Sequence, residues 1–309
     1  MSSELRVIGA DELRARLPMS GAIDALEGAF RSQDPSGGPV RAHVETPRGS
    51  LLLMPASGDG GLGVKLVTIT PSNPGRQLPL IHAAYVLFDG ETQAPVAIVE
   101  GAALTGLRTA AVSGLATRFL ARPEAARLVL FGAGVQAAAH LEAMTAVRPI
   151  ESLVVVSRSA GPAAALAEEG RRRGLAAEVG TPPAVGSADL VCTCTTSASP
   201  VFDGTALVPG AHVNAMGSYR PDARELDTES IRRARVAVET REVAMEEAGD
   251  LLIPIGEGAI DASHVVADLA EVVRGAAVRT SSEDVTVFKS VGMAFEDLVV
   301  ARAVLDAAS

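Results

Sequence analysis

The chain has 309 residues and a formal net charge of −10; 48% of its residues are hydrophobic and 3% are aromatic. The length predicts about two domains, and the acidic balance argues against nucleic-acid and membrane-surface partners. No stretch approaches roughly 18 uninterrupted apolar residues, so no membrane span is predicted. Cys192 and Cys194 alternate on one predicted strand and are poorly placed to pair, which favours a reduced, cytoplasmic setting.

The first part of the chain combines short strands with helices. Strands are predicted at 50–56, 63–70, 81–89 and 95–101, and their close succession favours antiparallel pairing. A long helix over 103–121 follows, with apolar residues at helical spacing.

From residue 127 onward the pattern changes to strands that alternate with helical segments. This alternation predicts a parallel, doubly wound sheet. A final helix, over 291–305, lies after this region, and we expect it to return to the N-terminal part. The strands of the alternating region are predicted at 127–132, 152–157, 176–180, 189–194, 212–217 and 235–239.

A glycine-rich turn joins the first strand of this region to an alanine-rich helix. Gly132 gives freedom for a tight turn, and Gly134 lets the backbone approach a pyrophosphate. Val135 and Gln136 then open the helix, whose N-terminus faces the phosphates, and Ala137 still permits close helix–strand packing. Because the turn lies between a strand and a helix, we interpret it as a dinucleotide-binding loop.

The second strand of this region ends in Ser157 and Arg158, where an NAD-binding fold usually carries an acidic residue. An arginine can pair with a ribose 2′-phosphate, and no carboxylate is present to repel it. The sequence therefore favours NADP(H), with NAD(H) as the alternative; Arg158 stacked on adenine or turned to solvent is the other interpretation.

Other residues lie at the ends of later predicted strands, where a doubly wound sheet meets its ligand, and one, Ser290, lies at the expected domain junction. We expect them to lie near the dinucleotide: Thr193, Thr195, Met216, Gly217 and Ser290.

Together, five stretches resemble the ornithine cyclodeaminase/μ-crystallin family. They cover most of the chain, and their order and spacing fit that family. The stretches are "GVKLVTITPSNPG" (63–75), "GLRTAAVSGLATRFLA" (106–121), "FGAGVQA" (131–137), "GSYRPDARELD" (217–227) and "VFKSVGMAFEDL" (287–298).

The resemblance implies an α/β subunit with two domains that assembles as a homodimer. A discontinuous α+β domain, 1–120 with 292–309, would bind the substrate and dimerise, and a Rossmann domain, 121–291, would bind the dinucleotide. The family acts on 2-amino or 2-imino carboxylates through the C2 hydrogen. Its chemistries include ornithine cyclisation, reduction of cyclic ketimines and dehydrogenation of amino acids.

The resemblance maps the substrate carboxylate onto three cations, Arg41, Lys65 and Arg108, with Lys65 also at the family's catalytic lysine. It places Thr109 near the nicotinamide. The residues agree: Arg108 lies in an apolar helix and Lys65 in an apolar strand, where an unpaired charge is costly. The alternatives are a surface arginine for Arg41, a lysine that extends its ammonium to the surface for Lys65, and a purely structural ion pair for Arg108. Lys65 can hold the carboxylate as an ammonium or, with a pKa lowered by burial and by neighbouring arginines, move a proton.

The chain departs from the cyclodeaminase pattern at two positions. Tyr219 lies where the family's cyclodeaminases carry an aspartate, and Leu52 lies where they carry a glutamate. A second ammonium group, as in ornithine, would lose both anionic partners. Asp222 is the nearest carboxylate, and we consider it both as a proton donor and as a simple turn residue.

These features favour NADPH-dependent reduction of Δ1-pyrroline-2-carboxylate or its six-membered analogue, with Lys65, Asp222 or water as proton donor. Tyr219 and His82 are further candidates for substrate contacts. The alternatives are an NAD-dependent ornithine cyclodeaminase and a non-catalytic NADPH-binding protein of the μ-crystallin type. No histidine or cysteine pair has metal-ligand spacing, so no metal is predicted.

Overall fold

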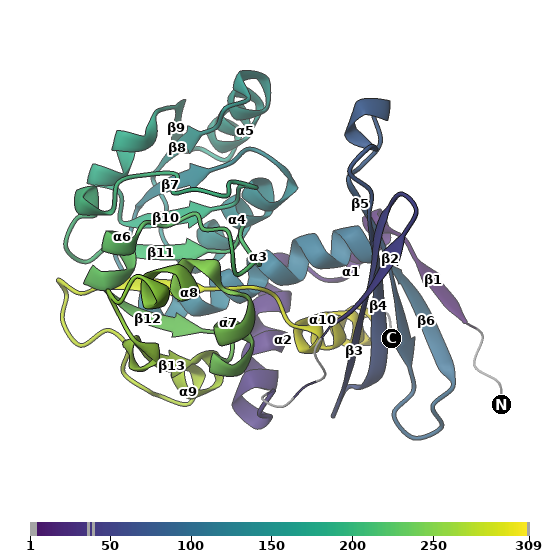
Figure 1. Ribbon diagram of the computed structural model, residues 1–309. Helices are drawn as coiled ribbons and strands as arrows, with labels where there is room; N and C mark the ends of the chain where they lie inside the picture. The colour runs from purple at the N-terminus through teal and green to yellow at the C-terminus, as the bar shows by residue number, and fades with distance from the viewer. Residues whose placement is uncertain (1–4, 36–37, 39–40, 308–309) are drawn as a thin grey trace. The chain divides into compact units, whose positions relative to one another are not determined.

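The computed structural model describes residues 5–35, 38 and 41–307 (Figure 1). The chain separates into two compact units. The first joins the chain up to Thr109 with the segment from Met293 onward, and the second is Ala110–Gly292. The boundary at residue 109 falls within helix α3 (Gly101–Leu120).

The first unit is built on a six-stranded mixed sheet in the order β1-β6-β5-β4-β3-β2. Neighbouring strands pair antiparallel, except that β1 pairs parallel with β6. The four strands predicted from the sequence are therefore confirmed. The strands are β1 (Arg6–Ile8), β2 (Ala42–Thr46), β3 (Gly49–Gly58), β4 (Gly61–Ile69), β5 (Ile81–Phe88) and β6 (Pro95–Glu100); the helices are α1 (Ala10–Arg16), α2 (Met19–Ser32), η1 (Pro74–Arg76) and α10 (Ala294–Asp306).

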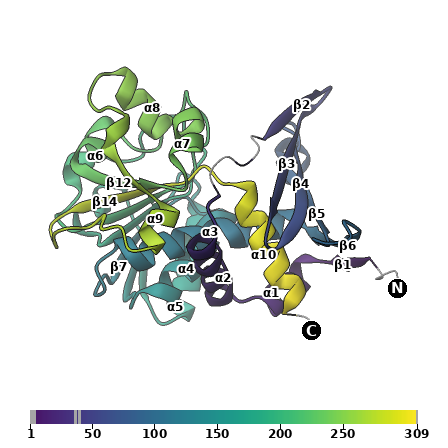
Figure 2. The same ribbon diagram turned by 90° about the horizontal axis from the view of Figure 1, so that it is seen from below.

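The C-terminal helix α10 packs on one face of this sheet, against β3, β4 and β5, and also contacts α2 (Figure 2). Phe295 of α10 meets Phe30 of α2 edge to face, with ring centroids 5.3 Å apart. The last helix thus returns to the N-terminal part as expected, although it begins at Ala294 and not at residue 291.

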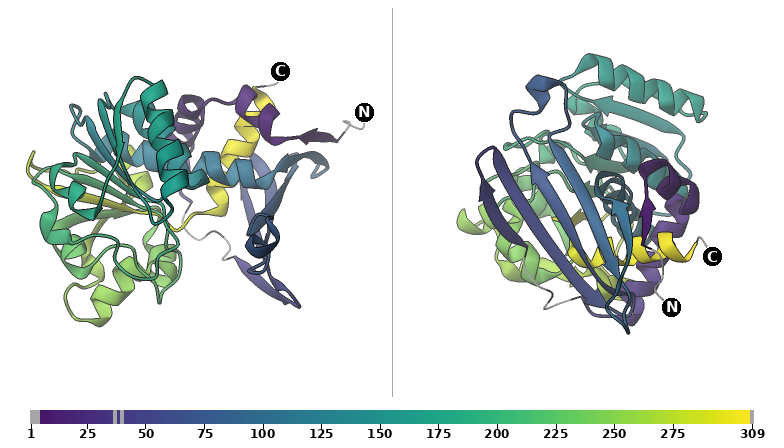
Figure 3. Two further views of the ribbon diagram at one scale, coloured as in Figure 1. Left: turned by 90° about the horizontal axis from the view of Figure 1, so that it is seen from above. Right: turned by 90° about the vertical axis from the view of Figure 1, so that its right-hand side faces the viewer.

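Figure 3, right, shows the face of this sheet that lies opposite α10. Side chains at even and odd positions of a strand point to opposite faces, and many of those opposite the α10 side are apolar yet only half-buried. They are Leu51, Leu53, Pro55, Leu62, Val64, Leu66, Ala84, Val86, Phe88, Val96 and Ile98.

The second unit contains an eight-stranded sheet in the order β13-β12-β14-β11-β10-β7-β8-β9, in which every pair is parallel. This is the predicted Rossmann-type sheet. Its strands are β7 (Arg127–Phe131), β8 (Ser152–Val156), β9 (Ala176–Val179), β10 (Leu190–Thr193), β11 (His212–Ala215), β12 (Ala234–Val238), β13 (Val265–Asp268) and β14 (Val285–Lys289).

Helices connect these strands, as the crossover of a parallel pair requires. The helices are α4 (Val135–Val147), α5 (Ala160–Arg172), α6 (Thr228–Arg233), α7 (Arg241–Glu247), α8 (Gly249–Gly256) and α9 (Leu269–Val273), with short 3₁₀ turns η2 (Pro182–Ser187), η3 (Gly204–Ala206) and η4 (Ala262–His264). The strand order reverses between β7 and β10, and ligands of such sheets bind at the carboxyl end of that switch point.

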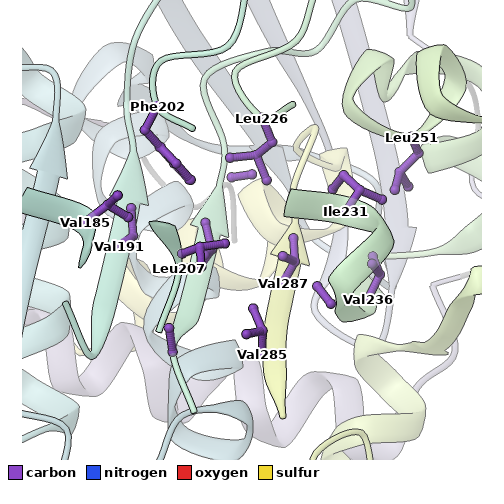
Figure 4. Packing of buried hydrophobic residues seen from close by; sticks show 14 of the residues in the cluster. Val185, Val191, Phe202, Leu207, Leu226, Ile231, Val236, Leu251, Val285 and Val287 are labelled. Atoms are coloured by element: carbon purple, nitrogen blue, oxygen red, sulfur yellow. The ribbon is translucent and has the colours of Figure 1, made fainter. Parts of the chain in front are cut away.

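The core of the second unit is mostly aliphatic, with Phe131 and Phe202 as its aromatic members (Figure 4). Val191, Val236 and Val287 come from three strands of the sheet, and Ile231 and Leu251 from helices α6 and α8. β-Branched side chains suit a strand buried on both faces. Among the described residues, no helix is both long and apolar enough to cross a membrane.

Two histidines of the second unit are fully buried. His140 on α4 has its Nδ1 2.8 Å from the Gln136 carbonyl and its Nε2 2.9 Å from Ser113 Oγ. Burial lowers the pKa of His140 to about 4. Burial also lowers the pKa of His212 to about 3, and the nearby charges of Arg279 and Arg148 act in the same direction.

Because burial lowers the pKa of both imidazoles, we expect the protein to lose stability in acid. The unfolded chain takes up protons near pH 6.5, whereas the folded protein does so only near pH 4 and below, so the free energy of unfolding falls as the pH drops through this window. Each imidazole contributes about 2 kcal/mol of this loss at pH 5. Urea unfolding at pH 7 and pH 5 measures it. His140→Gln reduces the slope, whereas exposed His43→Asn retains it; an equal slope in wild type and His140→Gln contradicts the account.

Candidate functional site

The loop after β7 requires glycine at its first position. Gly132 has φ +105°, a region that favours glycine. A Cβ there would lie 2.4 Å from the carbonyl oxygen of Cys194, the residue that follows β10. The two strand ends that flank the switch point therefore approach each other through Gly132.

The second glycine of the loop has a different environment. Gly134 is the N-cap of α4 with φ −95°, and a Cβ there would meet nothing within 4 Å. The first turn of α4 contains no acidic residue, and Val135 is 72% exposed. The amides at this helix start are free of intrahelical partners, so the terminus is suited to an anionic group.

The end of β8 carries Ser157 and then Arg158, which is exposed. Ser157 Oγ accepts a hydrogen bond from the amide of Ser159, at 3.2 Å. Helix α5 begins directly afterwards at Ala160, and residues 157–160 contain no carboxylate. The position is thus cationic and open.

A buried carboxylate joins the ends of β10 and β11. Glu225 accepts hydrogen bonds from Thr193 Oγ1 at 2.8 Å, from the amide and hydroxyl of Thr195 at 2.8 and 2.6 Å, and from the amide of Gly217 at 2.7 Å. Three residues predicted near the cofactor are therefore held by one side chain that the sequence analysis did not select. Burial raises the pKa of Glu225, although the Thr195 hydrogen bond and the charge of Lys289 oppose this rise.

Glu225 is itself fixed by Asp250 of α8. Asp250 Oδ1 accepts from the amides of Glu225 and Leu226, both at 2.8 Å. Its Oδ2 lies 2.8 Å from Lys289 Nζ, which also donates to the Ser218 carbonyl. All the charged members of this network are buried.

Glu239 plays the same part at the end of β14. It accepts from Ser290 Oγ at 2.7 Å and from the amides of Val291 and Gly292 at 2.9 and 3.0 Å. Ser290, a predicted cofactor residue, is buried in this arrangement. Met216, another predicted cofactor residue, is half-buried, and its amide donates a hydrogen bond to the Thr193 carbonyl at 3.3 Å.

In the first unit, Lys65 lies in the middle of β4, in register with Met54 of β3 and Tyr85 of β5. Its side chain is 2% exposed, and its Nζ is 2.9 Å from Oδ1 and 2.7 Å from Oδ2 of Asp297 on α10. Burial raises the pKa of the neighbouring Tyr85 hydroxyl, and the Asp297 carboxylate raises it further.

Arg108 of α3 belongs to the same cluster. Its Nη1 is 2.7 Å from Glu296 Oε2, and its Nε is 3.2 Å from Asp297 Oδ1. Arg108 is therefore ion-paired within the protein, as expected for an arginine in an apolar helix, and its contact with a substrate carboxylate stays a prediction. Neither acidic partner was predicted from the sequence, although the pair of carboxylates inside the apolar segment "MAFEDLVV" is a usable signal.

The pKa of Lys65 is lowered to about 8. Burial is the main cause; the charges of Arg108 and Arg41 act with it, and the Asp297 carboxylate opposes it. Arg41, directly before β2, is therefore close enough to be felt by the ammonium. Thr109, next to Arg108 on α3, is buried.

The remaining predicted substrate residues lie within their own units. His82 is exposed and pairs with Thr68 in the sheet, a position on the opposite face from Lys65 and Tyr85. Tyr219, in the second unit, is 40% exposed. Asp222 is exposed and bonded by Arg220 Nε at 2.9 Å, and this hydrogen bond lowers the pKa of Asp222.

Leu52, where cyclodeaminases of the family carry a glutamate, is buried in an apolar cluster with Met54 and Val67. The local environment would disfavour an anion there. Among the described residues, no group of His, Cys, Asp and Glu side chains is placed to hold a metal ion.

We expect alanine to have a different effect at each of the two loop glycines. Gly132→Ala forces an alanine into left-handed backbone against a carbonyl oxygen, and we expect a loss of about 1–3 kcal/mol or more of stability. Gly134→Ala keeps the fold, because its Cβ meets no protein atom, yet it weakens NAD(P)H binding about tenfold. Thermal unfolding and fluorescence titration of NAD(P)H separate the two effects. Unchanged affinity in Gly134→Ala would contradict a cofactor at this loop.

Comparison with known proteins agrees with this arrangement. A Δ1-pyrroline-2-carboxylate reductase of Bacillus cereus is 38% identical over 307 residues, covering 96% of this chain and 94% of that protein. Ketimine reductase mu-crystallin of Rattus norvegicus is 38% identical over 311 residues, covering 97% and 96%. The structure of Thermococcus litoralis Δ1-pyrroline-2-carboxylate reductase in complex with NADH and L-proline matches with a TM-score of 0.92 at 35% identity, covering 98% and 97%. The model of one family matches residues 6–309, and the chain belongs to it: the ornithine cyclodeaminase/mu-crystallin family.

Proposed function

We propose that this chain reduces a cyclic ketimine carboxylate, Δ1-pyrroline-2-carboxylate or its six-membered analogue, to the cyclic amino acid. It is an NAD(P)-dependent oxidoreductase of its family. The observation that carries the proposal is the buried pair of cations, Lys65 and Arg108, held together by the carboxylates of α10. Relatives named as reductases of this substrate class support it.

In this proposal the first unit binds the substrate. Arg108 presents a planar guanidinium, which suits a carboxylate, and Lys65 adds a point charge beside it. Arg41 is the third cation of the site. We leave His82 outside it, because His82 lies on the other face of the sheet. Fixing the carboxylate fixes the adjacent C2, and this positioning supplies much of the catalysis.

The second unit binds the dinucleotide at Gly132, Gly134 and the start of α4, with Glu225 and Glu239 holding the neighbouring loops. A bound nicotinamide would supply the hydride for C2 of the C=N bond. Lys65 is our choice for the proton that the ring nitrogen takes up, since its pKa of about 8 suits transfer near neutral pH. Asp222 is the weaker candidate, because its pKa is lowered and it is paired with Arg220.

Two positions argue against ornithine as the substrate. Leu52 lies in an apolar cluster, and the family resemblance places Tyr219 where cyclodeaminases carry an aspartate. A second ammonium would therefore remain unpaired at both positions, which is costly in a closed site.

The assay that tests this proposal follows NAD(P)H absorbance with the five- and six-membered cyclic imines. We expect turnover of at least one ring and formation of proline or its six-membered homologue. Release of ammonia from ornithine without net cofactor change would instead indicate a cyclodeaminase. No turnover of either ring, by protein that binds NAD(P)H, would reject the reductase.

Exposed Arg158 after β8 favours NADPH over NADH. Arg158→Ala removes the charge that would pair with the 2′-phosphate, and we expect kcat/KM for NADPH to fall about 10-fold or more with little change for NADH. Arg171→Ala, at an exposed arginine already paired with Glu168, is the matched control. An equal loss with both cofactors would remove Arg158 from this role.

We also propose that the chain forms a homodimer through the half-buried apolar face of the six-stranded sheet. A contiguous apolar face of this extent is typical of an interface in a folded protein. The face belongs to the strands that carry Lys65 on their other side, so dimerisation would also stiffen the substrate site.

Charges introduced on this face test the dimer. Val64→Glu combined with Val86→Glu buries two carboxylates in the interface, and we expect the mass in solution to fall from twice 31.6 kDa to that of one chain. Val266→Glu, at an exposed position of the second unit, retains the dimer. Light scattering after size-exclusion chromatography gives the mass; a monomeric wild type would overturn the proposal.

A further inference from the structure

The chain uses lysine only twice. Of its 27 lysine and arginine residues, only Lys65 and Lys289 are lysines; all the others are arginine. Both lysines are fully buried, and each ammonium lies within 3 Å of an aspartate that is itself fully buried. Lysine is the cation whose pKa shifts readily on burial, whereas arginine stays charged. Its restriction to two interior positions points to a specific use of the amine.

Asp297 contacts both cations of the first unit. Its two oxygens lie 2.9 and 2.7 Å from Lys65 Nζ, and Oδ1 is also 3.2 Å from Arg108 Nε. Glu296, its neighbour on α10, contacts only Arg108 of these two, at 2.7 Å. The adjacent carboxylates therefore differ: among the residues that the structure describes, Asp297 alone contacts both the Lys65 ammonium and the Arg108 guanidinium.

We infer that Asp297 is a positioning residue of the proposed reductase: its carboxylate fixes the Lys65 ammonium beside the Arg108 guanidinium, so that both cations meet one substrate carboxylate. The inference rests on the proposed function for the identity of the substrate. It adds a residue that touches neither substrate nor cofactor and acts through Lys65 and Arg108.

A gain in stability does not by itself explain why Asp297 is ion-paired with Lys65 and Arg108 in the protein interior. Buried ion pairs lose much of their Coulombic gain to desolvation, and well-packed apolar side chains of similar volume are often as stable. Breaking such a pair is costly because it leaves a buried charge unpaired. The Asp297 carboxylate instead fixes the position of the Lys65 amine and keeps it protonated.

Asp297 also keeps Lys65 charged. Burial, Arg108 and Arg41 all favour the neutral amine, and the Asp297 carboxylate opposes them. The other ionisable groups of the cluster are Glu296 on α10 and Tyr85 on β5. Without the Asp297 charge, Lys65 would lose its proton at a lower pH, and a site that needs the ammonium would fail as the pH rises.

The experiment exploits the two lysines. Protein labelled with [ε-¹³C]lysine gives two side-chain resonances, and Lys65→Met assigns them. We expect Asp297→Asn to lower the titration midpoint of Lys65 by at least about one pH unit, since it removes the nearest opposite charge. The fall of kcat/KM toward alkaline pH moves down with it, and kcat/KM drops by roughly 100-fold above neutral pH.

Two variants control for a merely structural role. Glu296→Gln removes the carboxylate that contacts Arg108 but not Lys65. We therefore expect a higher KM for the imine with an unchanged Lys65 titration. Asp297→Glu retains the charge with one more methylene; we expect it to keep the Lys65 midpoint near that of wild type and to recover part of the activity. This second variant decides the matter if Asp297→Asn does not fold.

The inference is overturned if Lys65 titrates at the same pH in wild type and Asp297→Asn, or if Asp297→Glu shifts the midpoint as far as the uncharged variant would. The resonance titration needs no turnover. A shifted midpoint in a protein that reduces neither imine would therefore uphold the link from Asp297 to Lys65 and reject only the substrate.

Discussion

The cost of burying charge governs this structure. Lys65 and Arg108 lie in apolar elements, a strand and a helix, where an isolated cation would be strongly destabilising. Both are neutralised by adjacent acids of α10, Asp297 and Glu296, which come from the opposite end of the chain. The return of the C-terminal helix onto the six-stranded sheet is therefore a requirement of the cationic cluster as well as a packing event.

The same constraint shapes the second unit. Glu225, Asp250 and Glu239 are buried. Glu225 and Glu239 accept hydrogen bonds from amides and hydroxyls at the carboxyl ends of the parallel strands, and Asp250 accepts from the amides of Glu225 and Leu226. Carboxylates bonded in this way hold the loops at the edge of the sheet where a dinucleotide binds in folds of this type. In both units, buried acids that need not contact a ligand hold the residues proposed to do so.

Local signals in the sequence predict much of this arrangement. The β/α alternation and the glycine turn indicate the parallel sheet, and Arg108 within an apolar helix predicts an ion pair. The partner of Lys65 is harder to predict, because Lys65 and Asp297 are 232 residues apart and no local pattern joins them. Strand β14 was not predicted because it contains Lys289, a charge that buried Asp250 neutralises. His82 lies on the other face of its strand because register, which the sequence does not reveal directly, decides the face.

The most direct test is a crystal structure with NADPH and pyrrole-2-carboxylate, a planar analogue of the cyclic imine. The account predicts that the carboxylate of the analogue lies within ion-pair distance of Lys65 and Arg108, with the ring carbon that carries it facing the nicotinamide and the Asp297 contact to Lys65 retained. An analogue bound elsewhere, with Lys65 and Arg108 still engaged only by Asp297 and Glu296, would contradict it.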